Sequence, residues 1–201
     1  MLSRPYENRA AEVIVREMAQ SLSLDLVAKR AVTKRIELVI VYDSENLSRP
    51  EIASHYHGAI DTDAYGRQMP KAAHGYFKFD RPTSSMKRIV SGFVSIFAQK
   101  VDPMLWVRRV YVIACDLTPE RAEDEEKPMQ LDLFTPVEEI EKREREAREA
   151  REKERHAQRV MLEIREKYGK NAILKGTSYL PNATGRERNG TIGGHRAEEK
   201  Q

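Results

Sequence analysis

The chain has 201 residues, of which 40% are hydrophobic and 33% charged, and its formal net charge is +3. This length and apolar content suffice for one modest core, and the charged fraction predicts that part of the chain is solvated helix or tail. No apolar run reaches the roughly 18 residues that span a membrane, and no signal-peptide pattern is present, so we expect a cytoplasmic protein with no membrane partner. The single cysteine, Cys115, lies in an apolar run and predicts a structural thiol rather than redox chemistry.

The charges are unevenly distributed along the chain. Residues 1–115 carry 17 Lys and Arg against 12 Asp and Glu, residues 116–135 carry 2 against 7, and residues 136–201 carry 16 against 13. The chain therefore has a basic front, an acidic joint and a mixed tail. A mildly basic front is compatible with nucleic-acid binding without requiring it.

The first predicted element is an amphipathic helix over residues 7–31. Its apolar positions recur at helical spacing: Ala11, Val15, Met18, Leu22 and Leu26. Residues 36–42 are β-branched and almost wholly apolar, which predicts a strand buried largely on both faces. Residues 43–69 are polar and interrupted by Pro and Gly, and a hairpin turn is expected over residues 63–66.

A strand, a helix and another strand are predicted next. Residues 75–80 alternate as a half-exposed strand, and residues 81–85 supply hydroxyl groups that can cap the following helix. That helix spans residues 86–102 and contains Gly92, which costs about 1 kcal/mol relative to alanine. Residues 106–115 return to strand character.

The order helix, strand, strand, helix, strand is that of a βαββαβ sandwich, an α+β fold, whose opening strand is largely missing. Only the first residues, up to Tyr6, are a remnant of that strand. We therefore assign residues 1–117 to one domain and residues 118–136 to an acidic linker. Residues 137–168 form a charged helix, and residues 169–201 form a flexible tail rich in Gly, Arg and Asn.

The charged helix is predicted from a dense Glu/Arg run over residues 138–167 with many opposite charges at i, i+4 spacing. Its first half has almost no apolar stripe, so we expect a solvated spacer whose last turns dock on the domain. The expected docking face consists of Ala157, Val160, Met161, Ile164 and Tyr168. Gly169 fits a helix C-cap.

No enzyme active site is visible in the sequence. His55 and His57 would share one face of a strand, as metal ligands do, but no further Cys, His or carboxylate set completes the site. The chain has no Ser/His/Asp order, no P-loop and no dinucleotide-binding glycine motif. The basic positions are more suggestive, because Arg81 precedes a hydroxyl-rich helix start whose free N–H groups can receive a phosphate.

A pentapeptide in the acidic linker indicates a protein partner. Its residues are Gln130, Leu131, Asp132, Leu133 and Phe134, and prolines at 128 and 136 favour an extended backbone around it. A glutamine that can bond a pocket rim precedes three large apolar side chains, which have no local core to enter. The alternative is a segment that folds back on its own domain.

Taken together, several blocks of the chain resemble the C-terminal part of Y-family translesion DNA polymerases, in particular the UmuC-like members of Gram-positive bacteria. The resemblance covers nearly the whole chain. The blocks are residues 2–6, 74–75, 81–85, 107–110, 130–134, 167–176 and 186–195. The resemblance implies a little-finger domain of βαββαβ fold that grips duplex DNA, followed by a peptide that binds the bacterial β sliding clamp.

The resemblance also implies which residues bind. The DNA-facing residues would be Ser3, Arg4, Arg67, Lys71, His74, Arg108 and Arg109. Phosphate contacts of this kind grip DNA without reading its sequence, as a polymerase that traverses lesions requires. The clamp pocket would receive Gln130, Leu131, Asp132, Leu133 and Phe134. The implied role is lesion bypass in DNA repair, within the SOS response.

The family's catalytic parts are not matched in this chain. The palm domain, whose acidic residues hold two magnesium ions, would lie upstream of Met1, together with the fingers, the thumb and most of the first little-finger strand. The resemblance therefore implies a chain that does not polymerise DNA by itself and holds no cofactor. It implies a truncated gene product, a free-standing fragment or an intact polymerase seen in part, and an in-frame palm upstream would separate these.

Two further expectations concern assembly. Loss of the opening strand would expose a sheet edge, so self-association through that edge is expected. The alternative hypothesis for the function is a non-enzymatic interaction protein that assembles through its charged helix. The missing apolar a/d stripe in the first half of that helix argues against a long coiled coil.

Overall fold

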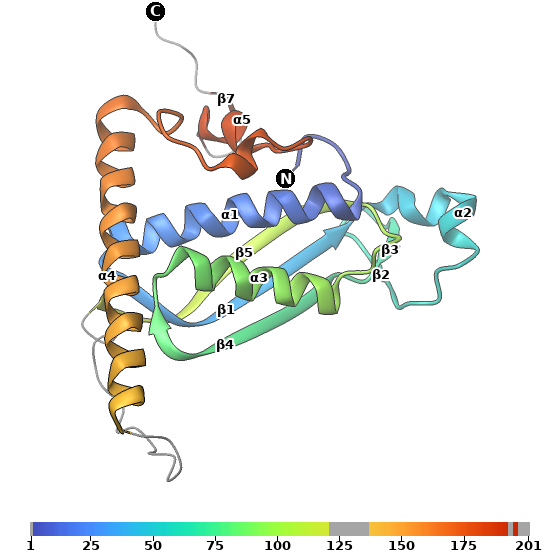
Figure 1. Ribbon diagram of the computed structural model, residues 1–201. Coiled ribbons are helices and arrows are strands. Elements are labelled where there is room, and N and C mark those ends of the chain that lie inside the picture. The colour runs from blue at the N-terminus through green and yellow to red at the C-terminus, as the bar shows by residue number, and fades with distance from the viewer. Residues whose placement is uncertain (1, 121–136, 193–194, 197–201) are drawn as a thin grey trace, which may run out of the picture.

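The computed structural model describes residues 2–120, 137–192 and 195–196. At its centre is a three-stranded antiparallel sheet of order β4-β1-β5, with α1 and α3 side by side on one face (Figure 1). The protein is thus a mixed α+β fold, as the sequence predicts. Its helices and strands are α1 (Asn8–Ala28), β1 (Ala31–Tyr42), the 3-10 helix η1 (Ser44–Ser48), α2 (Pro50–Ala53), β2 (Ile60–Thr62), β3 (Gln68–Pro70), β4 (Ala73–Thr83), α3 (Met86–Lys100), β5 (Val107–Pro119), α4 (Val137–Tyr168), the 3-10 helix η3 (Gly176–Tyr179), α5 (Gly185–Asn189), β6 (Thr191–Ile192) and β7 (His195–Arg196).

The core lies between the two helices and the sheet. Ile14 and Val15 of α1, Phe93 of α3, and Ile36 and Ile40 of β1 are completely buried. Full burial of one such side chain contributes about 1.5–3 kcal/mol, so this layer is the main source of stability. Within the described residues, no helix combines the length and the apolar character needed to cross a membrane.

The central strand β1 is covered by helices on one face only. Ile36, Leu38 and Ile40 are buried, whereas Glu37 and Val39 between them are half-buried. The prediction of a strand buried on both faces is therefore wrong. The apolar residues at the odd positions are partly shielded by the neighbouring strands β4 and β5 rather than by a second layer in the described part of the chain.

Gly92 is explained by the close approach of α3 to the sheet. A Cβ at this position would lie 2.8 Å from Cδ1 of Ile36 and 3.4 Å from the rings of Phe77 and Phe79. The unfavourable helix propensity of glycine, about 1 kcal/mol, is therefore accepted at a position where a larger side chain would push the helix away from the core.

Three predicted turns and caps are confirmed. The side chain of Ser85 caps α3 by accepting a hydrogen bond from the N–H of Arg88. β2 and β3 form a hairpin in which the N–H of Gly66 donates to the carbonyl of Asp63 at 3.0 Å. Gly169 has a φ of 93° after the end of α4, the left-handed conformation of a C-cap glycine.

The N-terminal residues lie beside the start of β5. Tyr6 and Val107 exchange two backbone hydrogen bonds of 2.9 and 2.7 Å, and the N–H of Leu2 donates to the carbonyl of Arg108 at 3.2 Å. Tyr6 and Val107 form an isolated antiparallel bridge. The opening residues thus extend the sheet beyond β5, which agrees with the expected strand remnant.

The helix α4 crosses the ends of α1 and α3 (Figure 1). Its anchor is Gln158, which is 3% exposed and donates from Nε2 to Oγ of Ser23 at 2.6 Å and to the carbonyl of Ser84 at 3.1 Å. Met161 adds an apolar contact with Leu24.

This docking face of α4 differs from the predicted one. Met161 belongs to it, but Ala157 and Val160 are exposed and Tyr168 is 66% exposed. The apolar residues of α4 predicted a neighbouring stripe of the helix. The observed contact is centred on a polar residue, Gln158, which an apolar pattern does not detect. A buried glutamine is tolerated here because partners on α1 and on the loop before α3 satisfy its amide.

Residues 170–190 fold against α1, which corrects the expectation of a flexible tail for this segment (Figure 1). Their anchor is Glu17 of α1, which is 3% exposed. Its Oε2 accepts from the N–H groups of Thr184 and Gly185, both at 2.9 Å, and lies 3.4 Å from Nη2 of Arg188. Composition alone does not predict this packing, because the residue that holds the tail lies in the first helix.

Candidate nucleic-acid interface

The face of the sheet opposite α1 and α3 is open and carries basic and aromatic side chains. In the register of the sheet, Val39 lies between His74 and Tyr111, and Glu37 lies between Tyr76 and Ile113. Directly opposed residues point to the same side of a sheet. The open face therefore consists of Arg35, Glu37, Val39 and Val41 of β1, His74, Tyr76 and Lys78 of β4, and Arg109, Tyr111, Ile113 and Cys115 of β5.

Large apolar side chains are exposed on this face. Tyr76 is 62% exposed, Tyr111 46% and Ile113 40%. Aromatic rings that stand free on a sheet offer flat surfaces on which a base or a sugar can pack. Grouped exposed apolar side chains of this kind mark an interaction surface.

The charges on the open face are mainly positive. Glu37 lies 3.3 Å from Nη2 of Arg35 and 3.5 Å from Nε2 of His74, so its negative charge is shared by two basic groups. Lys78 and Arg109 have no ion-pair partner in the part of the chain that the structure describes. These two cations stand on the two outer strands and are available to an external anion.

Of the seven residues that the resemblance assigns to DNA, two lie on the open face: His74 and Arg109. Arg108 falls at an irregularity in the β1–β5 ladder, where its Nε lies 3.7 Å from Oδ2 of Asp43. Arg108 is thus tied to the start of the η1 turn and is separated from its neighbour Arg109.

The other four predicted residues lie elsewhere. Ser3 and Arg4 are in the N-terminal segment, and Arg4 donates to Oδ1 of Asn182 in the tail at 3.1 Å. Arg67 and Lys71 belong to the β2–β3 hairpin region, at the end of the molecule away from α4 (Figure 1). Arg67 is held by the aspartate of its own turn at 2.7 Å.

Sequence reasoning missed four residues of this surface: Arg35, Lys78, Tyr76 and Tyr111. The pattern that could have found them is strand alternation. Each occupies a position one residue away from a core-facing residue of the same strand, and such neighbours point to the opposite face.

The residues predicted to bind a clamp, Gln130, Leu131, Asp132, Leu133 and Phe134, lie outside the described residues.

The start of α3, which the sequence suggests as a phosphate site, is occupied by a carboxylate of α4. Oε2 of Glu154 accepts from Oγ of Ser85 at 2.7 Å, and Oε1 accepts from the N–H of Lys87 at 3.0 Å. The partial positive charge of a helix N-terminus favours an anion at this place. The chain supplies that anion itself, so the open sheet face is the better candidate for phosphate binding.

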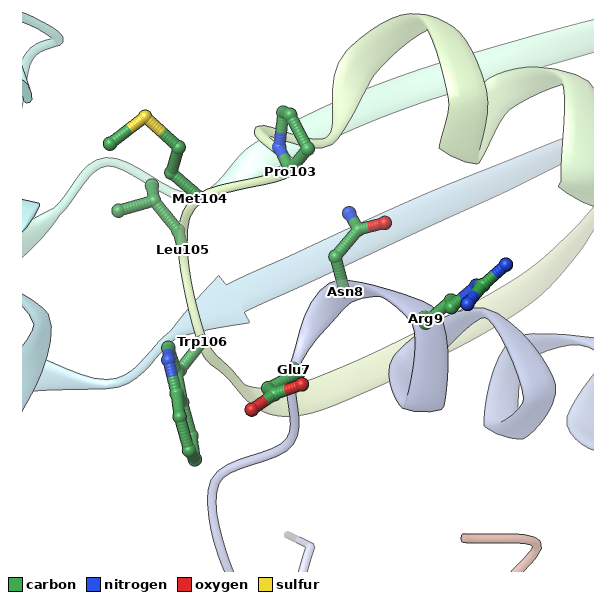
Figure 2. Close-up of a pocket in the computed structure, with 7 residues that line it drawn as sticks. All are labelled: Glu7, Asn8, Arg9, Pro103, Met104, Leu105 and Trp106. Atoms are coloured by element: carbon green, nitrogen blue, oxygen red, sulfur yellow. The ribbon is translucent and has the colours of Figure 1, made fainter. Parts of the chain in front are cut away.

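A small pocket lies between the start of α1 and the loop before β5, with a volume of about 390 Å³. Figure 2 shows that Trp106 and Met104 point away from Asn8 rather than toward a common centre. No described group of three or more His, Cys, Asp and Glu side chains could hold a metal ion. His55 bonds the carbonyl of Glu51 in the turn after α2 and is not on a strand, which corrects the expected geometry of the histidine pair.

Cys115 provides a chemical probe of the open face, because it is the only cysteine in the chain. It is half-buried, and burial raises the pKa of its thiol while the negative charge of Glu37 raises this pKa further. Only the thiolate is nucleophilic, so we expect slow alkylation near neutral pH and a rate midpoint above the usual value for cysteine. Glu37→Gln should move this midpoint down in a pH series with iodoacetamide, and an unmoved midpoint would contradict the assignment.

A comparison of the chain with the models of known protein families finds no match, and a comparison with curated proteins finds none either.

Proposed function

We propose that this chain is a DNA-binding and clamp-docking module of the type found in Y-family translesion DNA polymerases. Its role would be to hold primer–template DNA during lesion bypass in DNA repair. The observation that carries this proposal is the open sheet face, on which unpaired Lys78 and Arg109 accompany Tyr76 and Tyr111. The element order, with Tyr6 against β5, supports a little-finger topology.

The two cations lie at opposite ends of the open face. Lys78 is paired in register with Arg35, and Arg109 is paired with Val41, which lies six residues further along β1. With about 3.3 Å per residue and about 5 Å per strand, their backbone positions are about 20 Å apart along the strands and about 10 Å apart across them. Cations this far apart can contact separate phosphates of one duplex, which holds the duplex without reading its bases.

The DNA proposal is tested by binding to a fluorescein-labelled primer–template duplex over a series of salt concentrations. Each phosphate contact releases counterions and contributes about −0.9 to the slope of log K against log salt. With Lys78 and Arg109 in contact, we expect a slope of about −2. Binding without salt dependence, or no binding at low salt, would remove the open face as a DNA surface.

The clamp proposal rests on the sequence of residues 130–134. Three large apolar side chains next to a glutamine are the kind of anchors that dominate peptide binding. Leu133→Ala/Phe134→Ala should weaken binding to purified β sliding clamp by at least about 100-fold, since each lost anchor costs about 2 kcal/mol. Met129→Ala is the matched control outside the pentapeptide. Equal clamp affinities of the two variants in a surface-binding assay would contradict the docking role.

A further inference from the structure

A groove of about 1020 Å³ runs between α4, the outer strand β4 and the start of α3. Its floor is formed by Phe77 and Phe79, whose rings lie 5.2 Å apart, and by Gly92 of α3. The wall that α4 contributes has small side chains, including Ala147 and Ala150. Of the residues in the DNA surface proposed above, Lys78 also lines this groove.

The groove exists because of the way in which α4 is anchored. Glu154 and Gln158 hold the middle of the helix against the start of α3 and against α1. One turn and two turns earlier, Ala150 and Ala147 are too small to fill the space above the sheet. Phe77 consequently remains 37% exposed beside a cavity with an apolar floor.

The edge of β4 offers the backbone groups that an added strand requires. β1 pairs with one side of β4 from Ala73 to Lys78, and no strand of the described residues pairs with the other side. An extended peptide can bind such an edge through main-chain hydrogen bonds, with alternate side chains entering a neighbouring pocket. On β4, the pocket nearest the edge is the groove floored by Phe77 and Phe79.

The rim of the groove is positively charged. Asp80 is already paired with Arg88, and Glu154 is engaged at the start of α3. The side-chain cations of Lys87, Arg151 and Lys153 have no ion-pair partner among the described residues. A ligand that brings both apolar and acidic side chains would match the floor and the rim together.

We propose that this groove binds an extended acidic and apolar peptide segment of a partner protein, which adds to the edge of β4. Its apolar residues pack on Phe77 and Phe79, and its carboxylates meet Lys87, Arg151 and Lys153. The floor lies on the helix side of the sheet, whereas the proposed DNA contacts lie on the open side, and Lys78 at the edge is the residue that the two surfaces share.

The proposal is tested with a fluorescein-labelled synthetic peptide in which leucine and glutamate alternate over ten residues. Full-length protein should bind this peptide, should not bind its leucine–lysine counterpart, and should lose the interaction when prolines interrupt the strand. Ala150→Trp fills the groove and should weaken binding at least tenfold. Glu149→Trp places the same ring on an exposed neighbouring position of α4 and should leave binding unchanged.

Equal peptide affinities in Ala150→Trp and Glu149→Trp, or equal binding of the acidic and basic peptides, would overturn the proposal. Two other occupants are distinguished in the same assay. Tenfold tighter peptide binding after replacement of Glu123, Asp124, Glu125 and Glu126 by their amides would assign the groove to the chain's own linker. A dimer in sedimentation that Ala150→Trp dissociates, and that the peptide does not affect, would assign the groove to a second copy. Either result would overturn the proposal that a partner segment binds there.

Discussion

Replacing Glu17 by alanine is expected to detach the tail from α1 and to lower the free energy of unfolding by about 3 kcal/mol. Oε2 of this buried carboxylate accepts two backbone hydrogen bonds from Thr184 and Gly185 and also contacts Arg188. Burial lowers the pKa of Arg188, and the charge of Glu17 acts in the opposite direction and keeps the guanidinium charged. Removing the carboxylate therefore leaves the buried N–H of Thr184 and that of Gly185 without their acceptor, and it takes away the negative charge that faces half-buried Arg188.

The Glu17 prediction is checked by urea denaturation and by limited proteolysis of the segment that follows α4. Glu12→Ala is the matched control, because Glu12 lies on the same helix and forms a half-exposed i, i+4 pair with Arg16 at 2.7 Å. Such a pair contributes only about 0.3–0.5 kcal/mol. Equal unfolding midpoints and equal rates of tail cleavage in the two variants would show that the tail is not held by Glu17.

The tail illustrates why part of this fold could not be predicted. Gly, Asn and Arg between residues 170 and 190 suggest flexibility because they bring few apolar side chains. The segment is held by residues far away in the sequence: the carboxylate of Glu17, 167 positions from Thr184, and the side chain of Gln20, which bonds Thr177. Nothing in the local pattern around Glu17 distinguishes it from Glu12, which is half-exposed on the same helix.

The sheet and its two covering helices, in contrast, could be predicted from periodicity. Helical spacing placed α1 and α3, and β-branched runs placed β1 and β5, because burial of one face imposes a period on each element. The same reasoning predicted too much burial for β1. An apolar strand sequence does not show whether helices cover one face of the sheet or both, and in the described structure they cover one. Once one face is known to be open, alternation identifies Lys78, Tyr76 and Tyr111 as its occupants.

Fewer of the assigned residues are available for DNA contacts than the resemblance implied. Arg108 and Arg4 are engaged by Asp43 and Asn182, so these two are poorer candidates for phosphate contacts than their charge suggests. A basic residue in a strand contributes to an external interface only when its own chain does not already neutralise it. By this criterion Lys78 and Arg109 are the strongest candidates.

Charge reversal of these two residues, Lys78→Glu/Arg109→Glu, is expected to weaken binding to a primer–template duplex by about 100-fold. A hydrogen bond to a charged group contributes about 1.5–3 kcal/mol, so the loss of two phosphate contacts amounts to about 3 kcal/mol. The slope of log K against log salt should become less steep by about 2, since each phosphate contact contributes about 0.9. Both quantities are measured by fluorescence anisotropy over a salt series.

The matched control is Lys142→Glu/Arg148→Glu, which changes the net charge equally on the exposed first half of α4. If the open face binds the duplex, this control should change affinity several-fold at most and leave the salt slope unaltered. Alkylation of Cys115 supplies an independent measurement, because this thiol lies on the same face and bound duplex should slow its reaction in the unaltered chain. Equal losses of affinity in the two double variants, with no protection of Cys115, would mean that net charge rather than the open face attracts DNA.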